Sequence, residues 1–553
     1  MSKLFCLLIA AAMVVIPCSI TSTQAQTEIL VKTSTHFIQV PAGTSPQSSG
    51  NISLAATLYQ PRFLAAGPAV IYIHGFGGRR LTGNDNLAAY IAAAGYTVLS
   101  YTARGFGEGE SGGRVTIAGP DEINDLKQVI DWLMDDPDDV ISPRVTRIGV
   151  VGGSYGGGHS LQIASDPRVA AVVPLIGWTD LEQALYPNGV INYKLGIGQF
   201  YSGLERQTGS APFYNYDRLL FEMLDTGAEG RALSQEVKQA LAARSVAEPG
   251  PDGRLVLKGS RQPTAPIFII QSWDDYLFPS TQMTDVFDQI TETKQIYMGR
   301  TGHPPGGHEY SGEEAYVGVQ ALRWFDHHLR GIGGRDSENV ASAPAPFAGP
   351  VYTTTDFPSD RLNFYLKAGG TLSRKKKKGN EGQESAGGIF HRNRIRSSRL
   401  GAELPSQSDM LSGSVESVSQ LPRRLVYTSA PLDSDVEMLG ASDVSLFVSS
   451  ATSADFDLIV RLYDVAPDGT ESEVTVGVTR VTGLGTGEVR RLKFRDFGDH
   501  WIFRRGHSIR LKVTNIDFPD FRPPGANDER ASEFTIHNSR AFLSSIKLPV
   551  RKR

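Results

Sequence analysis

Between residue 66 and about residue 335, short apolar runs alternate with stretches of helical periodicity. The runs "PAVIYIHG", "YTVLSYTARG" and "VTRIGVVGG" are typical of buried strands. The segment "NDNLAAYIAAAG" predicts a helix, with Asn84 or Asp85 as its N-cap and Gly95 at its end. A second helix is predicted by "EINDLKQVIDWLMDD", whose apolar face consists of Ile123, Leu126, Ile130 and Leu133. Strands and helices in alternation indicate an α/β fold, a parallel sheet with helices on both faces.

A chain of 553 residues is too long for one hydrophobic core, so further domains are expected after an α/β domain over residues 26–335. Residues 181–262 interrupt the alternation, which predicts a helical cap above the carboxyl ends of the strands; a helical excursion on the surface is the alternative. Residues 336–360 are rich in Pro, Ala and Ser, which predicts a linker. Residues 361–553 contain alternating segments such as "SIRLKVT", which predict a β-sandwich.

The N-terminus has the pattern of a secretory signal peptide over residues 1–25, with Lys3, an apolar run and small residues up to Ala25. The apolar run is shorter than a membrane span. We therefore expect cleavage, no stable membrane anchor, and a secreted or periplasmic protein. Both cysteines, Cys6 and Cys18, lie in this segment, so the mature chain is expected to use neither disulfides nor a thiol nucleophile.

Charge gives little reason to expect a macromolecular partner. The formal net charge of −4 is small for this length, and we expect no nucleic acid partner. The charged segment 371–398, which includes "SRKKKKGNEGQESAGG", is interpreted as a solvated loop, with a polyanion site as the alternative.

The stretch "VVGGSYGGGH" places Ser154 between glycines at the spacing Gly152-x-Ser154-x-Gly156. A predicted strand precedes this stretch and a predicted helix follows it, which is the setting of a nucleophile elbow. The glycines let strand and helix approach closely, and the sharp turn points the hydroxyl outwards. The sequence therefore predicts Ser154 as a nucleophile, and a serine in a glycine-rich loop is the alternative.

A serine nucleophile needs a base and a carboxylate that orients the base, in the chain order Ser, acid, His on this fold. The segment "APIFIIQSWDDYLFP" ends a predicted strand with Asp274 and Asp275. The segment "KQIYMGRTGHPPGGHE" ends the next strand with His303 and His308, and His303, which comes first, is preferred as the base. Prolines and glycines separate the two histidines and no cysteine assists, so we expect neither a metal nor another cofactor.

The negative charge that develops on an attacked carbonyl oxygen needs hydrogen-bond donors. The backbone N–H of Tyr155, directly after the predicted nucleophile, is one candidate. The loop "HGFGG" after an early strand supplies a second, the backbone N–H of Phe76, because the flanking glycines allow a close approach. A glycine turn that binds nothing is the alternative.

Taken together, these segments resemble the Xaa-Pro dipeptidyl-peptidase and cocaine-esterase-like serine hydrolases of the α/β-hydrolase superfamily. The similar segments are "ARGFGEGESGG", "RIGVVGGSYGG", "SWDDYLFP", "DFDLIVRLYDVAPDG" and "RRGHSIRLKVTNIDFPDF". The resemblance implies an α/β-hydrolase fold with a helical cap, followed by a jelly-roll (galactose-binding-like) domain. It assigns the acid to Asp275 and the base to His303.

The sequence departs from that family at three places. Thr102 stands where an aspartate is usual, and Arg300-Thr301 stand where Pro-Trp is usual before the histidine. The "HGFGG" loop stands where the family often has a tyrosine that serves the oxyanion, so we expect backbone donors alone. The first two departures bear on substrate specificity.

The resemblance implies cleavage of an acyl bond in a short peptide or small ester through an acyl-enzyme. An Xaa-Pro dipeptidyl-peptidase is the first interpretation, and it requires an acid for the free amine of the substrate. The candidates in or beside the predicted cap are Glu182, Glu205, Asp217 and Glu222.

A carboxylesterase or acylase is the second interpretation of the function. Trp178, Tyr186 and Phe200 would then line an acyl pocket, or they pack the cap. A catalytically silent binding protein is the third interpretation, and the sequence leaves the oligomeric state open.

Overall fold

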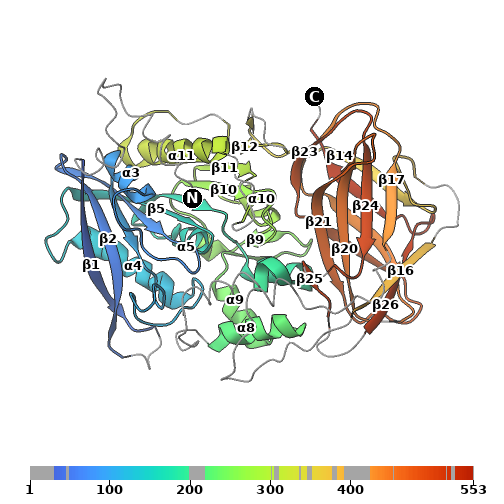
Figure 1. Ribbon diagram of the computed structural model, residues 1–553, viewed down its shortest axis with the longest axis horizontal. Coiled ribbons are helices and arrows are strands. Elements are labelled where there is room, and N and C mark those ends of the chain that lie inside the picture. The colour runs from blue at the N-terminus through green and yellow to red at the C-terminus, as the bar shows by residue number, and fades with distance from the viewer. Residues whose placement is uncertain are drawn as a thin grey trace.

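The computed structural model describes residues 30–44, 49–197, 218–300, 302–303, 311–334, 338–345, 351–376, 383–390, 424–452, 454–517, 520–524 and 530–551. The predicted signal peptide, Phe200, Glu205, Asp217 and His308 lie outside these residues, as do residues 377–382 and 391–398 of the charged segment. Two domains lie side by side along the long axis of the molecule, an α/β domain and a C-terminal all-β domain (Figure 1).

The α/β domain is built on one large sheet. Its described strands are β1 (Val31–Pro41), β2 (Asn51–Pro61), β3 (Ala66–Ile73), β4 (Thr97–Tyr101), β5 (Arg144–Gly153), β6 (Val169–Leu175), β10 (Ile267–Ser272), β11 (Lys294–Gly299), β12 (Val340–Ser342) and β13 (Tyr352–Thr354). They lie in the order β1-β2-β4-β3-β5-β6-β10-β11-β12-β13. The strands from β4 to β12 in this order run parallel, and β1, β2 and β13 pair antiparallel at the two edges.

Helices cover both faces of this sheet, as the alternating pattern predicted. They are α3 (Leu87–Ala93), α4 (Pro120–Asp135), α5 (Tyr155–Ile163), α10 (Thr281–Phe287), α11 (Ser311–Phe325) and the π-helical turn η4 (Asp326–Arg330). Helices α3 and α11 share one core cluster with the sheet, while α4, α5 and α10 belong to the cluster on the other face. The apolar side chains of α4 are buried at all four predicted positions, Ile123, Leu126, Ile130 and Leu133.

The N-terminus of α3 differs from the prediction by a residue. The capping side chain is that of Asn86, which accepts a hydrogen bond of 3.0 Å from the backbone N–H of Ala89. Asn84 and Asp85 therefore precede the cap. Gly95 lies just after the helix with a φ of +98°, a conformation that favours glycine.

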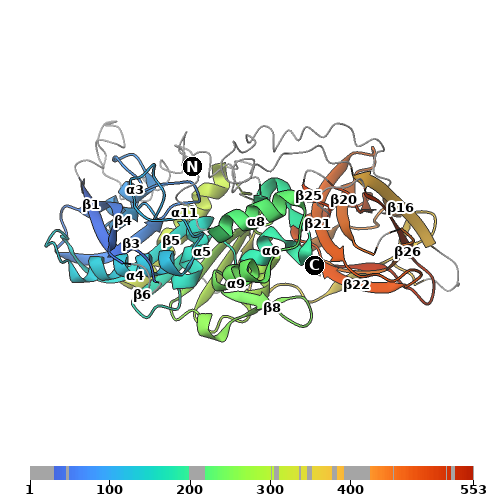
Figure 2. The same ribbon diagram turned by 90° about the horizontal axis from the view of Figure 1, so that it is seen from below.

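Between β6 and β10 the chain leaves the sheet for the segment that the sequence predicted as a cap. Its described elements are α6 (Leu181–Leu185), the 3₁₀ turn η1 (Pro187–Gly189), β7 (Ile191–Asn192), the π-helical turn η2 (Tyr193–Ile197), α8 (Arg218–Glu229), α9 (Gln235–Ala243), β8 (Ala247–Pro249), β9 (Leu255–Leu257) and the 3₁₀ turn η3 (Gly259–Arg261). Helices α6, α8 and α9 lie in the middle of the molecule, between the α/β sheet and the C-terminal domain (Figure 2).

The C-terminal domain is all-β, as predicted. Its described strands are β14 (Arg361–Lys367), β15 (Thr371–Ser373), β16 (Gln383–Phe390), β17 (Leu425–Ser429), β18 (Val436–Gly440), β19 (Asp443–Ser449), β20 (Phe456–Val465), β21 (Glu471–Val481), β22 (Arg490–Arg495), β23 (Asp499–Phe503), β24 (Ser508–Thr514), β25 (Phe521–Arg522), β26 (Arg530–His537) and β27 (Ser545–Pro549). The main sheet follows the order β16-β26-β19-β27-β14-β15-β17-β24-β20-β21, with β22 also on β19.

This sheet nearly closes on itself around one apolar core. A β-bridge between Gly477 of β21, at one end of the sheet, and Asp496 connects that end to the chain directly after β22, the strand that pairs with β19. The alternation in "SIRLKVT" has the predicted effect, because Ile509, Leu511 and Val513 of β24 are buried in this core.

The two domains are joined by more than the chain connection. Strand β25 of the C-terminal domain pairs antiparallel with β7 of the α/β domain. Arg495 of β22 forms an ion pair with Asp285 of α10. Within the predicted linker, residues 336–360, the chain forms β12 and β13, which extend the sheet of the α/β domain.

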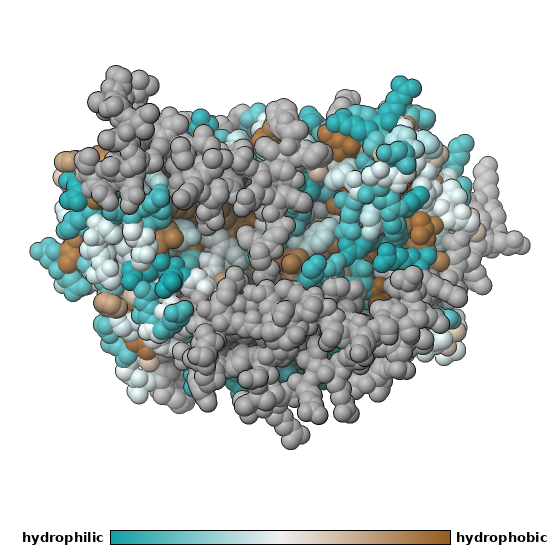
Figure 3. Space-filling model, in the orientation of Figure 1, coloured by the Kyte–Doolittle hydropathy of each residue, from teal (hydrophilic) through white to brown (hydrophobic). Residues whose placement is uncertain are grey.

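The described surface on the face shown in Figure 3 is a mixture of hydrophilic residues and small hydrophobic patches. Large apolar side chains that are exposed include Phe37, Phe63 and Ile332. None of the described helices is both long enough and apolar enough to span a membrane.

Candidate active site

Ser154 lies on the sharp turn between β5 and α5. Its φ of +57° and ψ of −113° are a strained backbone conformation for a residue with a side chain. A Cβ on Gly156 would lie 2.3 Å from the carbonyl oxygen of Ile73, and one on Gly152 would lie 2.5 Å from that of Gly156. Both positions therefore require glycine, and the turn presents the Ser154 hydroxyl above the carboxyl end of the sheet.

Three polar side chains from separate loops form a hydrogen-bonded series at this turn. The Ser154 hydroxyl Oγ lies 2.8 Å from Nε2 of His303, and Nδ1 of His303 lies 2.9 Å from Oδ2 of Asp275. Asp275 follows β10 and His303 follows β11, neighbouring parallel strands whose carboxyl ends meet at one edge of the sheet. Because Nδ1 donates to the carboxylate, Nε2 is left to accept the hydroxyl proton.

The carboxylate of Asp275 is fully buried and held from its other side. Its Oδ1 accepts the backbone N–H groups of Leu277 at 3.0 Å and of Phe278 at 2.9 Å. The ring of Phe278 lies edge-on to the His303 ring at a centroid distance of 5.0 Å. These contacts restrict both the carboxylate and the imidazole, so the pair is preorganised before any substrate binds.

The neighbouring acid, Asp274, has different partners. Its Oδ1 accepts hydrogen bonds from the hydroxyl of Ser272 and from the backbone N–H of Gly302, the latter at 3.1 Å. Asp274 therefore ties the acid-bearing loop to the loop of His303, whereas Asp275 contacts the imidazole itself.

The loop "HGFGG" lies against the serine turn. A Cβ on Gly75 would lie 3.9 Å from the Cβ of Ser154. Tyr155 is the first residue of α5, where a backbone N–H has no acceptor within the helix. The Phe76 and Tyr155 rings contact each other at 6.0 Å between centroids. The "HGFGG" loop and the first turn of α5 therefore lie together beside the serine turn.

His74 anchors the start of this loop. Its Nε2 accepts the backbone N–H of Ala103 at 3.0 Å, so its single proton lies on Nδ1, which donates to the carbonyl oxygen of Gly75 at 2.7 Å. Burial lowers the pKa of His74 to about 4. The ring is neutral at neutral pH, as this pair of hydrogen bonds requires.

A buried polar network beneath the elbow was not predicted from the sequence. The phenol of Tyr155 donates to Oε2 of Glu122 at 2.6 Å, and His159 lies 3.4 Å from the same oxygen. Burial alone would raise the pKa of Glu122, but His159, Tyr155 and the N–H of Thr116 outweigh it and lower the pKa. The available signal was the presence of Glu122 and His159 within otherwise apolar helical faces.

Arg104, within the segment "ARGFGEGESGG", also has a structural role. Its guanidinium binds the carboxylate of Asp125 through Nε at 2.6 Å and Nη2 at 2.5 Å, and both side chains are buried. At the first departure from the family, the hydroxyl of Thr102 donates to Glu110 at 2.8 Å, which in turn pairs with Arg80. Glu110 therefore supplies a carboxylate next to the position where an aspartate is usual.

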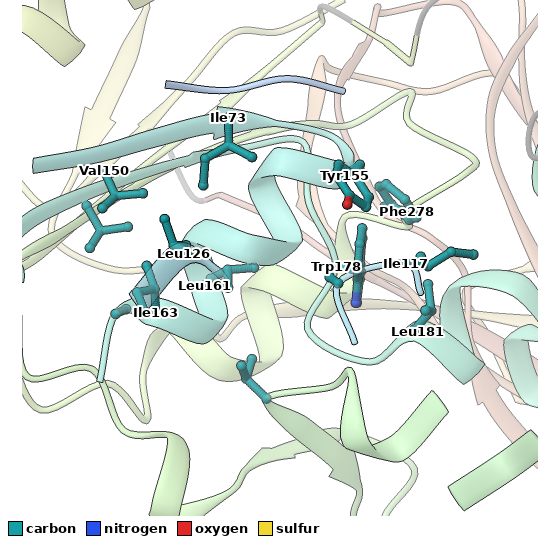
Figure 4. Packing of buried hydrophobic residues seen from close by; sticks show 14 of the residues in the cluster. Ile73, Ile117, Leu126, Val150, Tyr155, Leu161, Ile163, Trp178, Leu181 and Phe278 are labelled. Carbon is teal, nitrogen blue, oxygen red and sulfur yellow. The ribbon is translucent and has the colours of Figure 1, made fainter. Parts of the chain in front are cut away.

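The aromatic pocket candidates that the structure describes are packed inside the α/β domain. Trp178 is 1% exposed, contacts Phe278 and donates its Nε1–H to the carbonyl oxygen of Arg244 at 2.9 Å. Figure 4 shows Trp178 and Phe278 beside Tyr155, near the N-terminal end of α5. Tyr186 is 4% exposed and donates to the carbonyl oxygen of Met223 at 3.1 Å. Trp178 and Tyr186 therefore pack the interior of the domain, which the sequence analysis gave as the alternative to lining an acyl pocket.

The described amine-binding candidates are engaged with other side chains. Glu182 lies 3.6 Å from Nζ of Lys238, and Glu222 accepts the hydroxyl of Ser234 at 2.6 Å and pairs with Arg218.

Among the described residues, no three His, Asp or Glu side chains are placed to hold a metal ion. A cavity of about 300 Å³ between the domains is lined by residues such as Gln282 and Arg495 and by none of Ser154, Asp275 and His303.

The doubly covered parallel sheet, the serine turn and the Ser–His–Asp series define an α/β serine hydrolase. Family models match residues 49–305 as X-Pro dipeptidyl-peptidase (S15 family) and residues 337–546 as the X-Pro dipeptidyl-peptidase C-terminal non-catalytic domain. The two matches, in this order along the chain, confirm the resemblance seen in the sequence.

Relatives and solved structures are similar to the chain over most of its length. A protein named as a serine esterase in Mycobacterium tuberculosis is 23% identical, with 93% of this chain and 92% of that protein aligned. An aminopeptidase structure from a marine sediment archaeon has a TM-score of 0.68 and 17% identity, covering 98% of this chain and 100% of that one. A CocE/NonD family hydrolase from Staphylococcus aureus also reaches 0.68 at 15% identity, covering 94% and 97%. At these identities the two structures establish the fold.

Proposed function

We propose that this protein is a secreted serine hydrolase that cleaves carboxylic esters through an acyl-enzyme on Ser154. The observation that carries the proposal is the series of 2.8 Å and 2.9 Å contacts from the Ser154 hydroxyl through His303 to Asp275. The apolar segment in residues 1–25, followed by small residues, supports secretion.

The first half of the reaction forms the acyl-enzyme. Nε2 of His303 takes the proton of the Ser154 hydroxyl while Oγ attacks the substrate carbonyl carbon. Asp275 keeps the imidazole in the required tautomer and stabilises its protonated form. The C–O bond to the leaving group then breaks, and the proton on Nε2 passes to the departing alkoxide, which leaves as an alcohol.

The second half uses water. His303 removes a proton from water, the resulting hydroxide attacks the acyl carbon, and Oγ of Ser154 leaves with the proton from Nε2. The products are a carboxylic acid and the free enzyme. In both halves the oxyanion is stabilised by the backbone N–H groups of Tyr155 and Phe76.

Two observations favour an ester over a peptide with a free amine. Of the acids proposed to hold the amine, the described ones, Glu182 and Glu222, already bond to neighbouring side chains. The M. tuberculosis relative that aligns with 93% of the chain is named as an esterase. An Xaa-Pro dipeptidyl-peptidase is the second candidate, and the two family models support it.

The test compares p-nitrophenyl butyrate with Ala-Pro-p-nitroanilide on the purified mature chain, with Ser154→Ala beside it. We expect ester hydrolysis and a loss of about 10⁴-fold or more in kcat for the variant. A fluorophosphonate probe should label the wild type and not the variant. Anilide cleavage that is abolished by blocking the amine would establish the peptidase instead. Unchanged activity in a folded Ser154→Ala would refute both.

A further inference from the structure

The loop that carries His303 is tied to the C-terminal domain by a buried arginine. Arg300 follows β11 directly, is 6% exposed, and is one of the residues at which the sequence departs from the family. Its backbone N–H donates to Oε1 of Glu313 at 2.5 Å. Its guanidinium donates to the carboxylate of Asp499 and, at 3.1 Å, to the carbonyl oxygen of His500, both in β23. The first residue of the catalytic loop is therefore fixed by both its backbone and its side chain.

His500 of the same strand also reaches the loop of the catalytic acid. Trp273, which precedes Asp274 and Asp275, donates its Nε1–H to the hydroxyl of Ser342 at 2.9 Å. That hydroxyl lies 2.8 Å from Nδ1 of His500. Nε2 of His500 lies 3.3 Å from the acceptor Oε1 of Glu437, so the ring proton lies on Nε2 and Nδ1 accepts the proton of the Ser342 hydroxyl. Asp499 thus supports the base-bearing loop, and His500 supports the acid-bearing loop.

The Arg300–Asp499 contact joins the two domains at a large desolvation penalty. Both side chains are removed from water, at 7% and 1% exposure, and apolar packing usually joins surfaces without that desolvation cost. Elsewhere the domains are joined by strand pairing between β25 and β7 and by the ion pair of Arg495 with Asp285. A buried pair at the start of the His303 loop is instead suited to setting the geometry of the base.

We propose that Asp499 is a positioning residue for the reaction, which holds the His303 loop in register with Ser154 and Asp275 through its ion pair with Arg300. The proposal rests on the proposed function of that site. It gives the C-terminal domain, which the family model describes as non-catalytic, a direct part in aligning the base. It also gives a reason for an arginine where the family has proline.

The test uses Asp499→Asn in the full mature chain with p-nitrophenyl butyrate. Without its carboxylate partner, the buried guanidinium moves toward water and shifts the loop that follows it. A displacement of about 1 Å at a reacting group costs on the order of 10²-fold in rate. We expect kcat to fall about 100-fold while KM stays within about threefold. The split between kcat and KM separates a misplaced base from a loss of substrate binding.

A matched control separates positioning from domain docking. Asp285→Asn breaks the other described Arg–Asp pair between the domains, with Arg495, and should leave kcat and KM as in the wild type. If Asp499→Asn does not fold, the double variant Arg300→Met/Asp499→Leu leaves no buried charge unpaired and is expected to show the same loss of kcat.

Each result decides the matter. A folded Asp499→Asn, or a folded double variant, with wild-type kcat would overturn the proposal. An equal loss of kcat in Asp285→Asn would also overturn it, because the effect would then belong to docking in general. Failure of the proposed function is recognised separately, by a Ser154→Ala variant that remains active.

Discussion

Replacing Asp275 by asparagine tests whether the buried carboxylate sets the tautomer of His303. An asparagine side chain has one acceptor oxygen and one amide group. If its oxygen faces the N–H groups of Leu277 and Phe278, its amide N–H faces Nδ1 of His303 and forces the ring proton to Nε2. Nε2 then cannot accept the proton of Ser154. In the opposite orientation the amide N–H groups face the backbone N–H groups of Leu277 and Phe278, and none of these donors has an acceptor.

The expected size of this effect follows from the loss of the competent tautomer. We expect kcat for p-nitrophenyl butyrate at pH 7 to fall roughly 10⁴-fold, which corresponds to about 5 kcal/mol in the activation free energy. KM should change little, because Asp275 is buried behind His303. Circular dichroism and a thermal melt would establish that the variant is folded.

A neighbouring substitution provides the control. Asp274→Asn alters a carboxylate that bonds Ser272 and Gly302 but not the imidazole, so it should cost less than about tenfold in kcat. If folded Asp275→Asn kept kcat within tenfold of the wild type, the assignment of Asp275 as the orienting acid would be refuted.

Three further predictions concern the elbow and its surroundings. Gly156→Ala should abolish soluble expression or activity, because the new Cβ would lie 2.3 Å from the carbonyl oxygen of Ile73; an active, folded variant would contradict the packing described. Trp178→Ala should lower the free energy of unfolding by about 3–5 kcal/mol in urea denaturation, because it leaves a cavity and removes the hydrogen bond to Arg244. A loss below about 1 kcal/mol would contradict the burial of the indole in the core. Burial lowers the pKa of His74 to about 4 in the folded protein, against 6.5 for the free side chain. The contribution of His74 to the free energy of unfolding should therefore be complete above pH 6.5 and fall by roughly 3 kcal/mol as the pH drops toward 4. A His74→Gln variant should lack this part of the pH dependence in thermal melts.

The sequence by itself determined the α/β class, because apolar runs and helical faces have different periods that survive without any tertiary information. It also determined the local chemistry of the elbow, since only glycines permit the approach that Gly152 and Gly156 make. The order of serine, acid and histidine followed from the fold, because each residue comes after a later strand of the same sheet and parallel strands end at the same edge. The alternation in β24 likewise fixed which side chains face the core of the all-β domain.

Only the tertiary structure decided which side chains face one another across loops. The local pattern does not separate Asp274 from Asp275, which only the family resemblance distinguished. In the structure the choice depends on where the imidazole of His303 lies. Glu122 and His159 meet Tyr155 beneath the elbow, and Asp499 meets Arg300, across long stretches of chain. The physical reason is that periodicity records whether a position is buried, while the partner of a buried polar group is set by how separate elements pack.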